Sequence, residues 1–219
     1  MSPDGARIAV VGDIGAYDVP ALVAKQFGAW QGPKVEAVEF PAIADTQAQL
    51  IDYPINRDQV VLAFAKKSLA RLDGDFDPYY IYTQIFGGGA LGSMSSRLFD
   101  LREESGLFYT ISGSLVAGSD EQPGMCMVKT IVSKDRLAEA ATVIKDTIAH
   151  AHETLTDDEC EEAKRAIVNT IVDSFTSNSG IAHTFLYVDR FNLPERYFDD
   201  RAQQLEPITV DAKIGRAHV

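Results

Sequence analysis

The order in which strand-like and helical hydrophobic patterns follow one another constrains this chain more than any other feature. Strand-like apolar runs lie at 7–12, 49–53, 59–65, 107–117 and 124–133. Helical spacing appears at 18–30, 78–86, 93–104 and, in several segments, from 135 to about 205. This order of strands, helices, strands and then several helices predicts an α+β fold, with helices packed on one face of a mostly antiparallel or mixed sheet.

Local signals refine this outline. The run 59–65 is almost entirely apolar, which favours a central strand. A turn-rich segment between 117 and 124 predicts that the two runs beside it form a hairpin. Asp77 followed by Pro78 predicts the N-cap and first turn of a helix. Thr156-Asp157-Asp158-Glu159 is a capping box and predicts the start of another helix.

The Pro- and Ala-rich segment 33–47 predicts a boundary between 1–40 and 41–213. The opening residues run so directly into the apolar run 7–12 that we expect upstream sequence to be missing. The last six residues, 214–219, can be back-translated as ATC GGA AGA GCA CAC GTC, which matches the start of a widely used sequencing adapter. We therefore expect 214–219 to be an artefact with no functional residue.

Charge and cysteine content exclude several classes of protein. The formal net charge of −12 argues against a nucleic-acid binder, because phosphate contacts need a Lys/Arg surface. No apolar run is long enough to cross a bilayer. Cys126 lies in an apolar run, which predicts a buried thiol. Cys160 lies among acidic residues, which should raise its pKa. Neither cysteine is predicted to be a nucleophile.

The glycine-rich segment invites a phosphate-binding interpretation. Gly87-x-Gly89-x-x-Gly92 formally matches the dinucleotide fingerprint, but that motif follows a strand, and a helix is predicted here. A P-loop would need lysine where Ser93 stands. A flexible connection between two helices is the favoured interpretation, and a nucleotide-binding domain is a weaker alternative.

Other polar residues offer no complete site by themselves. His150 and His152 are two residues apart on a predicted helix and so point in different directions, which favours solvated surface over a metal site. Arg102 near a helix end and Tyr109 entering a strand are, taken alone, a charge suited to the helix C-terminus and a core aromatic. No zinc site is predicted in this chain.

The stretch from Gly87 to Tyr109 carries a family resemblance. It reads Gly-Gly-Gly-x-x-Gly-Ser-Met-Ser-Ser-Arg-Leu-Phe-x-x-x-Arg-Glu-x-x-Gly-Leu-x-Tyr and resembles the signature of the C-terminal domain of the pitrilysin/insulinase metallopeptidases, which include the mitochondrial processing peptidases. Residues 2–13 and 27–30 resemble the strand and helix that close the preceding domain. Residues 155–164 resemble a later helix start.

The resemblance implies a LuxS/processing-peptidase-like fold of repeated α/β domains, in two halves that close into a chamber around an unfolded peptide. Arg102 and Tyr109 match the family's Arg and Tyr that bind the substrate backbone near the scissile carbonyl. Both can donate hydrogen bonds to a peptide carbonyl and stabilise a developing oxyanion. The glycines Gly87, Gly88, Gly89 and Gly92 are then expected to form a mobile substrate-binding loop beside the cleft.

The chain departs from the family pattern at the metal. The family's zinc motif, H-x-x-E-H with a downstream Glu, is absent here. The resemblance therefore implies that zinc is bound by a missing N-terminal domain or a partner half, and that this chain alone is inactive. We expect the substrate-binding portion of a zinc metalloendopeptidase, whose partners are a peptide and a second peptidase half. The alternative is a non-catalytic substrate-binding or structural subunit of a processing-peptidase-like heterodimer.

Overall fold

The computed structural model describes residues 2–36, 38–44, 47–88 and 96–210. Contacts divide the chain into two compact units. Unit 1 consists of Met1–Ala42 and Ile171–Asp200, and unit 2 of Ile43–Thr170 and Arg201–Val219. The expected artefact at 214–219 lies outside the described residues.

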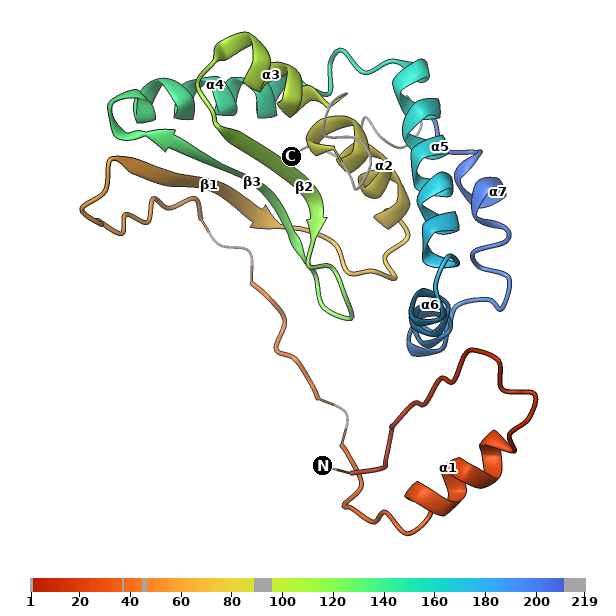
Figure 1. Cartoon of the computed structure of the whole chain (residues 1–219). Helices are drawn as coiled ribbons and strands as arrows, with labels where there is room; N and C mark the ends of the chain where they lie inside the picture. The colour runs from red at the N-terminus through yellow and green to blue at the C-terminus, as the bar shows by residue number, and fades with distance from the viewer. Residues whose placement is uncertain (1, 37, 45–46, 89–95, 211–219) are drawn as a thin grey trace. The chain divides into compact units, whose positions relative to one another are not determined.

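An antiparallel sheet forms the centre of unit 2 (Figure 1). Its strands are β1, Gln59–Lys67, β2, Thr110–Ala117, and β3, Met125–Ser133, in the order β1-β3-β2. The predicted hairpin is confirmed, since β2 and β3 pair antiparallel. The prediction of a central position for 59–65 is wrong, because β3 separates β1 from β2. The nearly apolar composition of 59–65 does not reflect burial on both faces, because β1 leaves aliphatic side chains such as Val61, which is 60% exposed, on the open face of the sheet.

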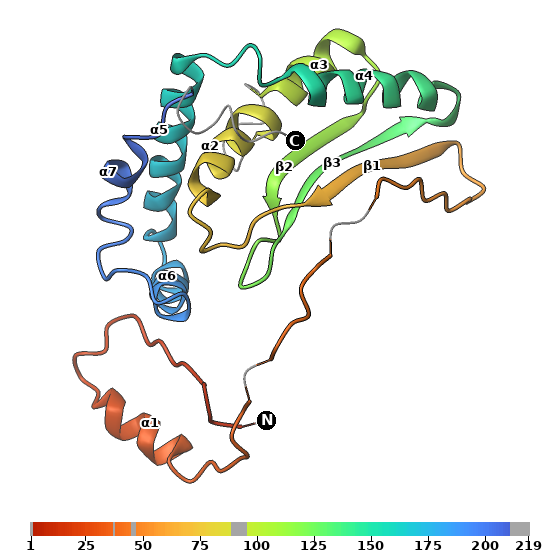
Figure 2. The same ribbon diagram turned by 180° about the vertical axis from the view of Figure 1, so that it is seen from behind.

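Three helices cover one face of this sheet (Figures 1 and 2). They are α2, Phe76–Gly87, α3, Arg97–Ser105, and α4, Leu137–His150, the last preceded by the 3-10 turn η2, Lys134–Arg136. Alternate residues of β3 are buried, so the helices cover a single face. This arrangement confirms the predicted α+β class. Buried side chains from the sheet and helices form one core, which includes Ile81, Phe86, Leu98, Leu115, Val128 and Ile144.

An irregularity in β2 joins the sheet to α2. The pairing register of β2 with β3 shifts between Ser114 and Ala117. The N–H of Leu115 donates instead to Thr83 Oγ1 of α2, at 3.0 Å. The Leu115 carbonyl accepts from the Ser68 hydroxyl and, at 3.3 Å, from the Cys126 thiol. Side chains therefore satisfy the backbone groups that the shifted register leaves without a strand partner.

The capping box at Thr156 is confirmed. The Glu159 N–H donates to Thr156 Oγ1 at 3.2 Å, and the Thr156 N–H donates to the Glu159 carboxylate at 3.0 Å. This cap opens α5, Asp157–Ser174. The boundary between the two units falls inside α5, at Thr170 and Ile171. Every helix of the described residues is too short or too polar to span a lipid bilayer.

The start of α2 differs from the prediction. Its N-cap is Asp75 and not Asp77, and no side chain caps the helix there. Asp77 instead pairs with the buried Arg201 of α7, Arg201–Leu205, through two hydrogen bonds of 2.6 and 2.7 Å. The helix predicted from Pro194 to about 205 is shorter in the structure, because turns occupy 195–200.

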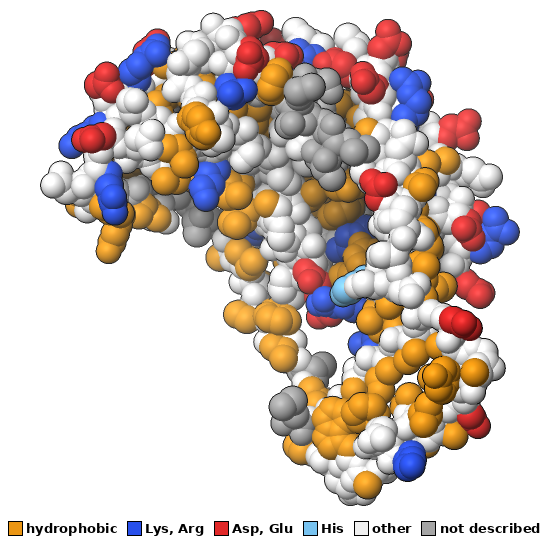
Figure 3. All heavy atoms as spheres, in the orientation of Figure 1, with side chains coloured by type: hydrophobic (Ala, Val, Ile, Leu, Met, Phe, Trp, Pro, Cys, Tyr) orange, Lys and Arg blue, Asp and Glu red, His pale blue; other side chains and the backbone are white. Residues whose placement is uncertain are grey.

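The described residues of unit 1 contain two complete helices. The amphipathic helix predicted at 18–30 is present as α1, Val19–Phe27, with Asp18 as N-cap, but none of its residues is buried. The second helix is α6, Asn178–Arg190, capped by the Ser177 hydroxyl, which accepts from the Gly180 N–H. Figure 3 shows hydrophobic side chains gathered over the part of unit 1 that contains α1. Exposed apolar residues there include Ile8, Val10, Leu22, Phe27 and Trp30.

Two predicted strands are absent from the described residues. Residues 7–12 and 49–53 have no regular structure, and Leu50 is 94% exposed. A strand exists only when a neighbour accepts its backbone hydrogen bonds. Neither segment pairs with a strand of the described residues, so the predictions of strands at 7–12 and 49–53 are wrong for this structure.

Candidate functional site

A short helix and a glycine turn position the residues of the candidate site. Ser96 caps α3, its hydroxyl accepting from the Phe99 N–H at 3.3 Å. Gly106 ends the helix with φ 57°, a left-handed conformation that glycine adopts without steric cost. The next two residues, Leu107 and Phe108, are buried in the core. The burial of Leu107 and Phe108 places Tyr109 at the surface, just before β2.

Arg102 lies in the last turn of α3 and reaches across to Tyr109. Its Nε–H donates to the backbone carbonyl oxygen of Tyr109 at 2.9 Å. Its Nη1 donates to the Glu103 carboxylate at 2.7 Å, and the guanidinium carbon lies 5.8 Å from the centre of the Phe99 ring. These three contacts hold the guanidinium in one orientation beside Tyr109. Glu103 and Phe99 were not predicted as site residues. Phe99 could have been, because it lies three residues before Arg102 on the same helix.

Both residues keep hydrogen-bond donors free for a ligand. The Arg102 side chain is 37% exposed, and its Nη2 donates to no other described residue. Tyr109 is 79% exposed, and its hydroxyl bonds to no described residue. A guanidinium and a phenol can each donate a hydrogen bond to a peptide carbonyl oxygen. The structure thus brings the two predicted residues side by side; their role in binding stays a prediction.

The glycines of the motif divide into two groups. A Cβ on Gly87 would lie 1.9 Å from the Gly113 carbonyl oxygen of β2, so the end of α2 contacts the sheet through a residue without a side chain. Gly88 follows with φ 70° and ends α2. Gly89 and Gly92 lie outside the described residues. The close contact with Gly113 therefore explains why position 87 needs glycine without reference to the predicted substrate binding.

Arg97, the first residue of α3, contacts the segment that begins α5. Its guanidinium donates to the Thr154 hydroxyl and carbonyl at 2.9 and 2.8 Å and to the Glu159 carboxylate at 2.9 Å. The charge of Arg97 thus joins the start of α3 to the capping box of α5. Burial raises the pKa of the nearby Tyr82 to about 12, with the Arg97 charge opposing the rise and the Glu159 carboxylate adding to it.

The described residues offer no metal site. They contain no group of three His, Cys, Asp or Glu side chains close enough to share an ion. His150 contacts Asp146 one turn earlier in α4. Both thiols are buried, and burial is the main cause that raises the pKa of Cys126 and of Cys160. The predicted burial of Cys126 and the predicted raised pKa of Cys160 are confirmed, although burial, and not the acidic neighbours, is the main cause at Cys160. The described residues do not fit a zinc ion.

One protein family matches most of this chain. The family model described as the peptidase M16 inactive domain matches residues 1–167. No curated protein matches the chain.

Several solved structures share the fold. A peptidase M16 inactive domain from Pseudomonas fluorescens has a TM-score of 0.76 at 24% identity, over 95% of this chain and 49% of that one. A protease from Helicobacter pylori has a TM-score of 0.73 at 16% identity, over 95% of this chain and 50% of that one. The inactive domain of a proposed zinc protease from Bordetella parapertussis has a TM-score of 0.59 at 14% identity, over 74% and 84%. The chain thus spans about half the length of the first two proteins.

Proposed function

The chain belongs to the family of the peptidase M16 inactive domain, and from this premise we propose that it is the substrate-binding part of a zinc-dependent metalloendopeptidase. The observation that carries the proposal is the pairing of Arg102 with Tyr109. The hydrogen bond from Arg102 Nε to the Tyr109 carbonyl fixes both residues on one rigid turn. Next to the start of β2, the Arg102 side chain is 37% exposed and Tyr109 is 79% exposed.

In this proposal, the Arg102 guanidinium and the Tyr109 phenol bind the carbonyl oxygen of an extended peptide. Their hydrogen bonds orient the scissile bond and become stronger as negative charge develops on that oxygen. The contact with Glu103 prevents the guanidinium from swinging away, so less entropy is lost when the peptide binds. The Gly88 turn leads into the glycine-rich segment that would lie beside the peptide.

The open face of the sheet supports a role in holding an unfolded peptide. Helices α2, α3 and α4 cover only the other face. The open face carries small, aliphatic and hydroxyl side chains from alternate positions of the strands, among them Val61, Ala63 and Ser112, with Lys129 of β3 between the last two. Such a surface can contact many peptide sequences through its apolar and hydroxyl groups. We propose that it forms part of the wall of a chamber.

We also propose that the catalytic metal and a second half come from outside this chain. No H-x-x-E-H motif occurs in the sequence, and the described residues do not fit zinc. The exposed apolar residues of unit 1, such as Ile8, Leu22 and Trp30, support a role for 1–40 in closing a preceding N-terminal domain. A domain of that kind would cover these side chains and supply the zinc.

Kinetics of the complete protein, including its upstream domain, test this function. We expect Tyr109→Phe and Arg102→Ala each to lower kcat/KM for an unfolded peptide about 100-fold or more, the loss typical of one removed oxyanion donor. The zinc content and the circular dichroism spectrum should stay unchanged. Tyr53→Phe, at a tyrosine that is 84% exposed, and Arg136→Ala, which removes a surface ion pair, are the matched controls.

Two outcomes would contradict the proposal. Unchanged kinetics for both Arg102→Ala and Tyr109→Phe would remove the assigned site. A complete protein without H-x-x-E-H or peptidase activity, but with peptide binding that Arg102→Ala abolishes, would favour the non-catalytic subunit.

A further inference from the structure

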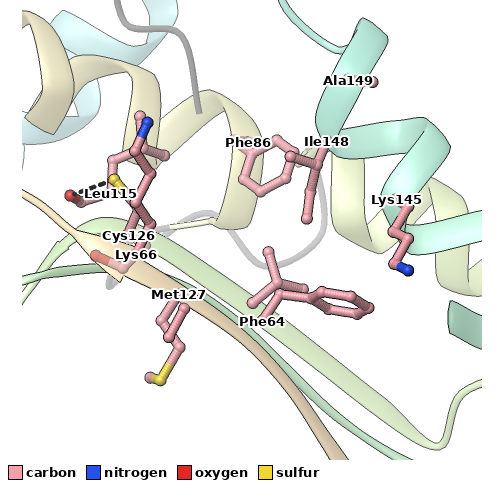
Figure 4. A pocket seen from close by; sticks show the side chains of 12 residues that line it. Phe64, Lys66, Phe86, Leu115, Cys126, Met127, Lys145, Ile148 and Ala149 are labelled. Carbon is pink, nitrogen blue, oxygen red and sulfur yellow. Dashed lines mark hydrogen bonds between the residues drawn. The ribbon is translucent and has the colours of Figure 1, made fainter. Parts of the chain in front are cut away.

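Unit 2 contains an apolar cavity between the sheet and α4, apart from the Arg102–Tyr109 site (Figure 4). Its volume is about 270 Å³. Its walls come from β1, β2, β3, α2 and α4, and include Phe64, Phe86, Leu115, Cys126, Val128 and Ile148. The Cys126 thiol already donates to the Leu115 carbonyl at 3.3 Å, so that part of the wall offers little free hydrogen bonding.

Two lysines are the charged groups that line this cavity. Figure 4 shows Lys145 of α4 on the side of Phe64, and its ammonium lies 6.0 Å from the centre of the Phe64 ring. Lys66 lies in β1 directly opposite Cys126 of β3. Neither lysine forms an ion pair with a carboxylate of the described residues. In a chain with a net charge of −12, an apolar cavity edged only by positive charge is an exception to the acidic surface.

We propose that this cavity binds the anion of a medium-chain carboxylic acid. The apolar walls contact the hydrocarbon chain, and the Lys145 ammonium attracts the carboxylate, while Figure 4 shows Lys66 on the opposite side of the cavity. A volume of about 270 Å³ is close to the lower end of the range for small-molecule pockets, about 300–1,000 Å³. A hydrocarbon chain of medium length, as in decanoate, is the size of ligand that matches this space.

The walls and the rim make other ligand classes a poor fit. A nucleotide or a sugar would bury polar groups against walls of phenylalanine, leucine, isoleucine and valine, without hydrogen-bond partners. A metal ion would find a single cysteine and no other typical ligand among the lining residues. Lys66, Lys145 and Ala149 are exposed, so the cavity opens to solvent where the charged end of the acid would lie.

Calorimetric titration of the full 219-residue chain tests the proposal. We expect decanoate to bind at one site per chain, and decanol, with the same chain length and no charge, to bind about fivefold more weakly. Butyrate should not bind detectably. The double variant Lys66→Gln/Lys145→Gln should lower the affinity for decanoate to that for decanol. Ala149→Phe, at an exposed position of α4 that lines the cavity, should abolish binding of both ligands.

The control for charge is Lys34→Gln/Lys129→Gln, which removes two exposed lysines that do not line the cavity. This variant should bind decanoate like the unaltered chain. The proposal is overturned if decanoate does not saturate a single site, if Ala149→Phe leaves the affinity unchanged, or if the control variant loses as much affinity as the cavity variant.

Discussion

The ion pair between Asp77 and Arg201 permits a prediction about which partner matters more. The pair joins the first turn of α2 to α7 through two hydrogen bonds of 2.6 and 2.7 Å. The Arg201 side chain is only 4% exposed, whereas the Asp77 side chain is 27% exposed. Removal of one partner therefore leaves very different residual charges in the protein.

Asp77→Asn leaves the guanidinium of Arg201 buried and always charged, with Gln204 Oε1 at 3.2 Å as a remaining neutral acceptor. Breaking a buried pair in this way typically costs about 3–5 kcal/mol. Arg201→Met leaves a carboxylate that water can reach and that the N-terminal dipole of α2 stabilises. We therefore expect a loss of about 1–2 kcal/mol for Arg201→Met, and a larger loss for Asp77→Asn.

Urea denaturation at pH 7, followed by circular dichroism at 222 nm, measures both losses. The control is Arg196→Met, which removes an exposed pair with Asp200 of 3.0 Å and should cost at most about 0.5 kcal/mol. The double variant Asp77→Asn/Arg201→Met should lose less than the sum of the single variants. Equal losses for the single variants, or a greater loss for Arg201→Met, would refute the argument from burial.

Two further changes test the core. Gly87→Ala should lower the free energy of unfolding by about 2 kcal/mol or more, because its Cβ would meet the Gly113 carbonyl oxygen, whereas Gly74→Ala, which meets open space, should change it little. Urea midpoints measure both, and equal midpoints would contradict the close contact. Burial raises the pKa of Tyr82 to about 12, so the unfolded chain ionises first near 10. The contribution of the Tyr82 proton to the free energy of unfolding is fully present below pH 10 and is lost as the pH rises to about 12. Between pH 9 and 12, the free energy of unfolding of Tyr82→Phe should therefore fall by roughly 2–3 kcal/mol less than that of the unaltered chain. Equal falls in the two proteins would contradict the raised pKa.

The features that the sequence predicted well depend on neighbours only a few residues apart. The hairpin of β2 and β3 needs one short turn between two apolar runs, and the capping box needs only Thr156 and Glu159. The approach of Arg102 to Tyr109 is also local, because Gly106 closes the helix between them. Local spacing therefore sufficed for the main fold class and for the position of the candidate site.

The features that the sequence missed depend on residues far apart in the chain. Asp77 has the ordinary properties of an N-cap, and only the distant Arg201 shows why it points elsewhere. Arg97 forms an ion pair with Glu159, which lies 62 residues later in the chain, and no local pattern indicates that pair. The runs 7–12 and 49–53 have the composition of strands, yet composition does not supply the neighbour to which a strand must bond.

The edge position of β1 has a consequence for the behaviour of the chain in concentrated solution. The backbone groups of β1 that face away from β3 meet no other strand of the described residues. Between Val60 and Ala65 this edge carries no charged or proline residue, and the lysines come only at its end. Such an edge is a template for intermolecular strand pairing and for aggregation. The chain on its own should therefore form β-rich oligomers as its concentration rises, and a lysine placed at Val61, whose side chain is already exposed, should suppress them.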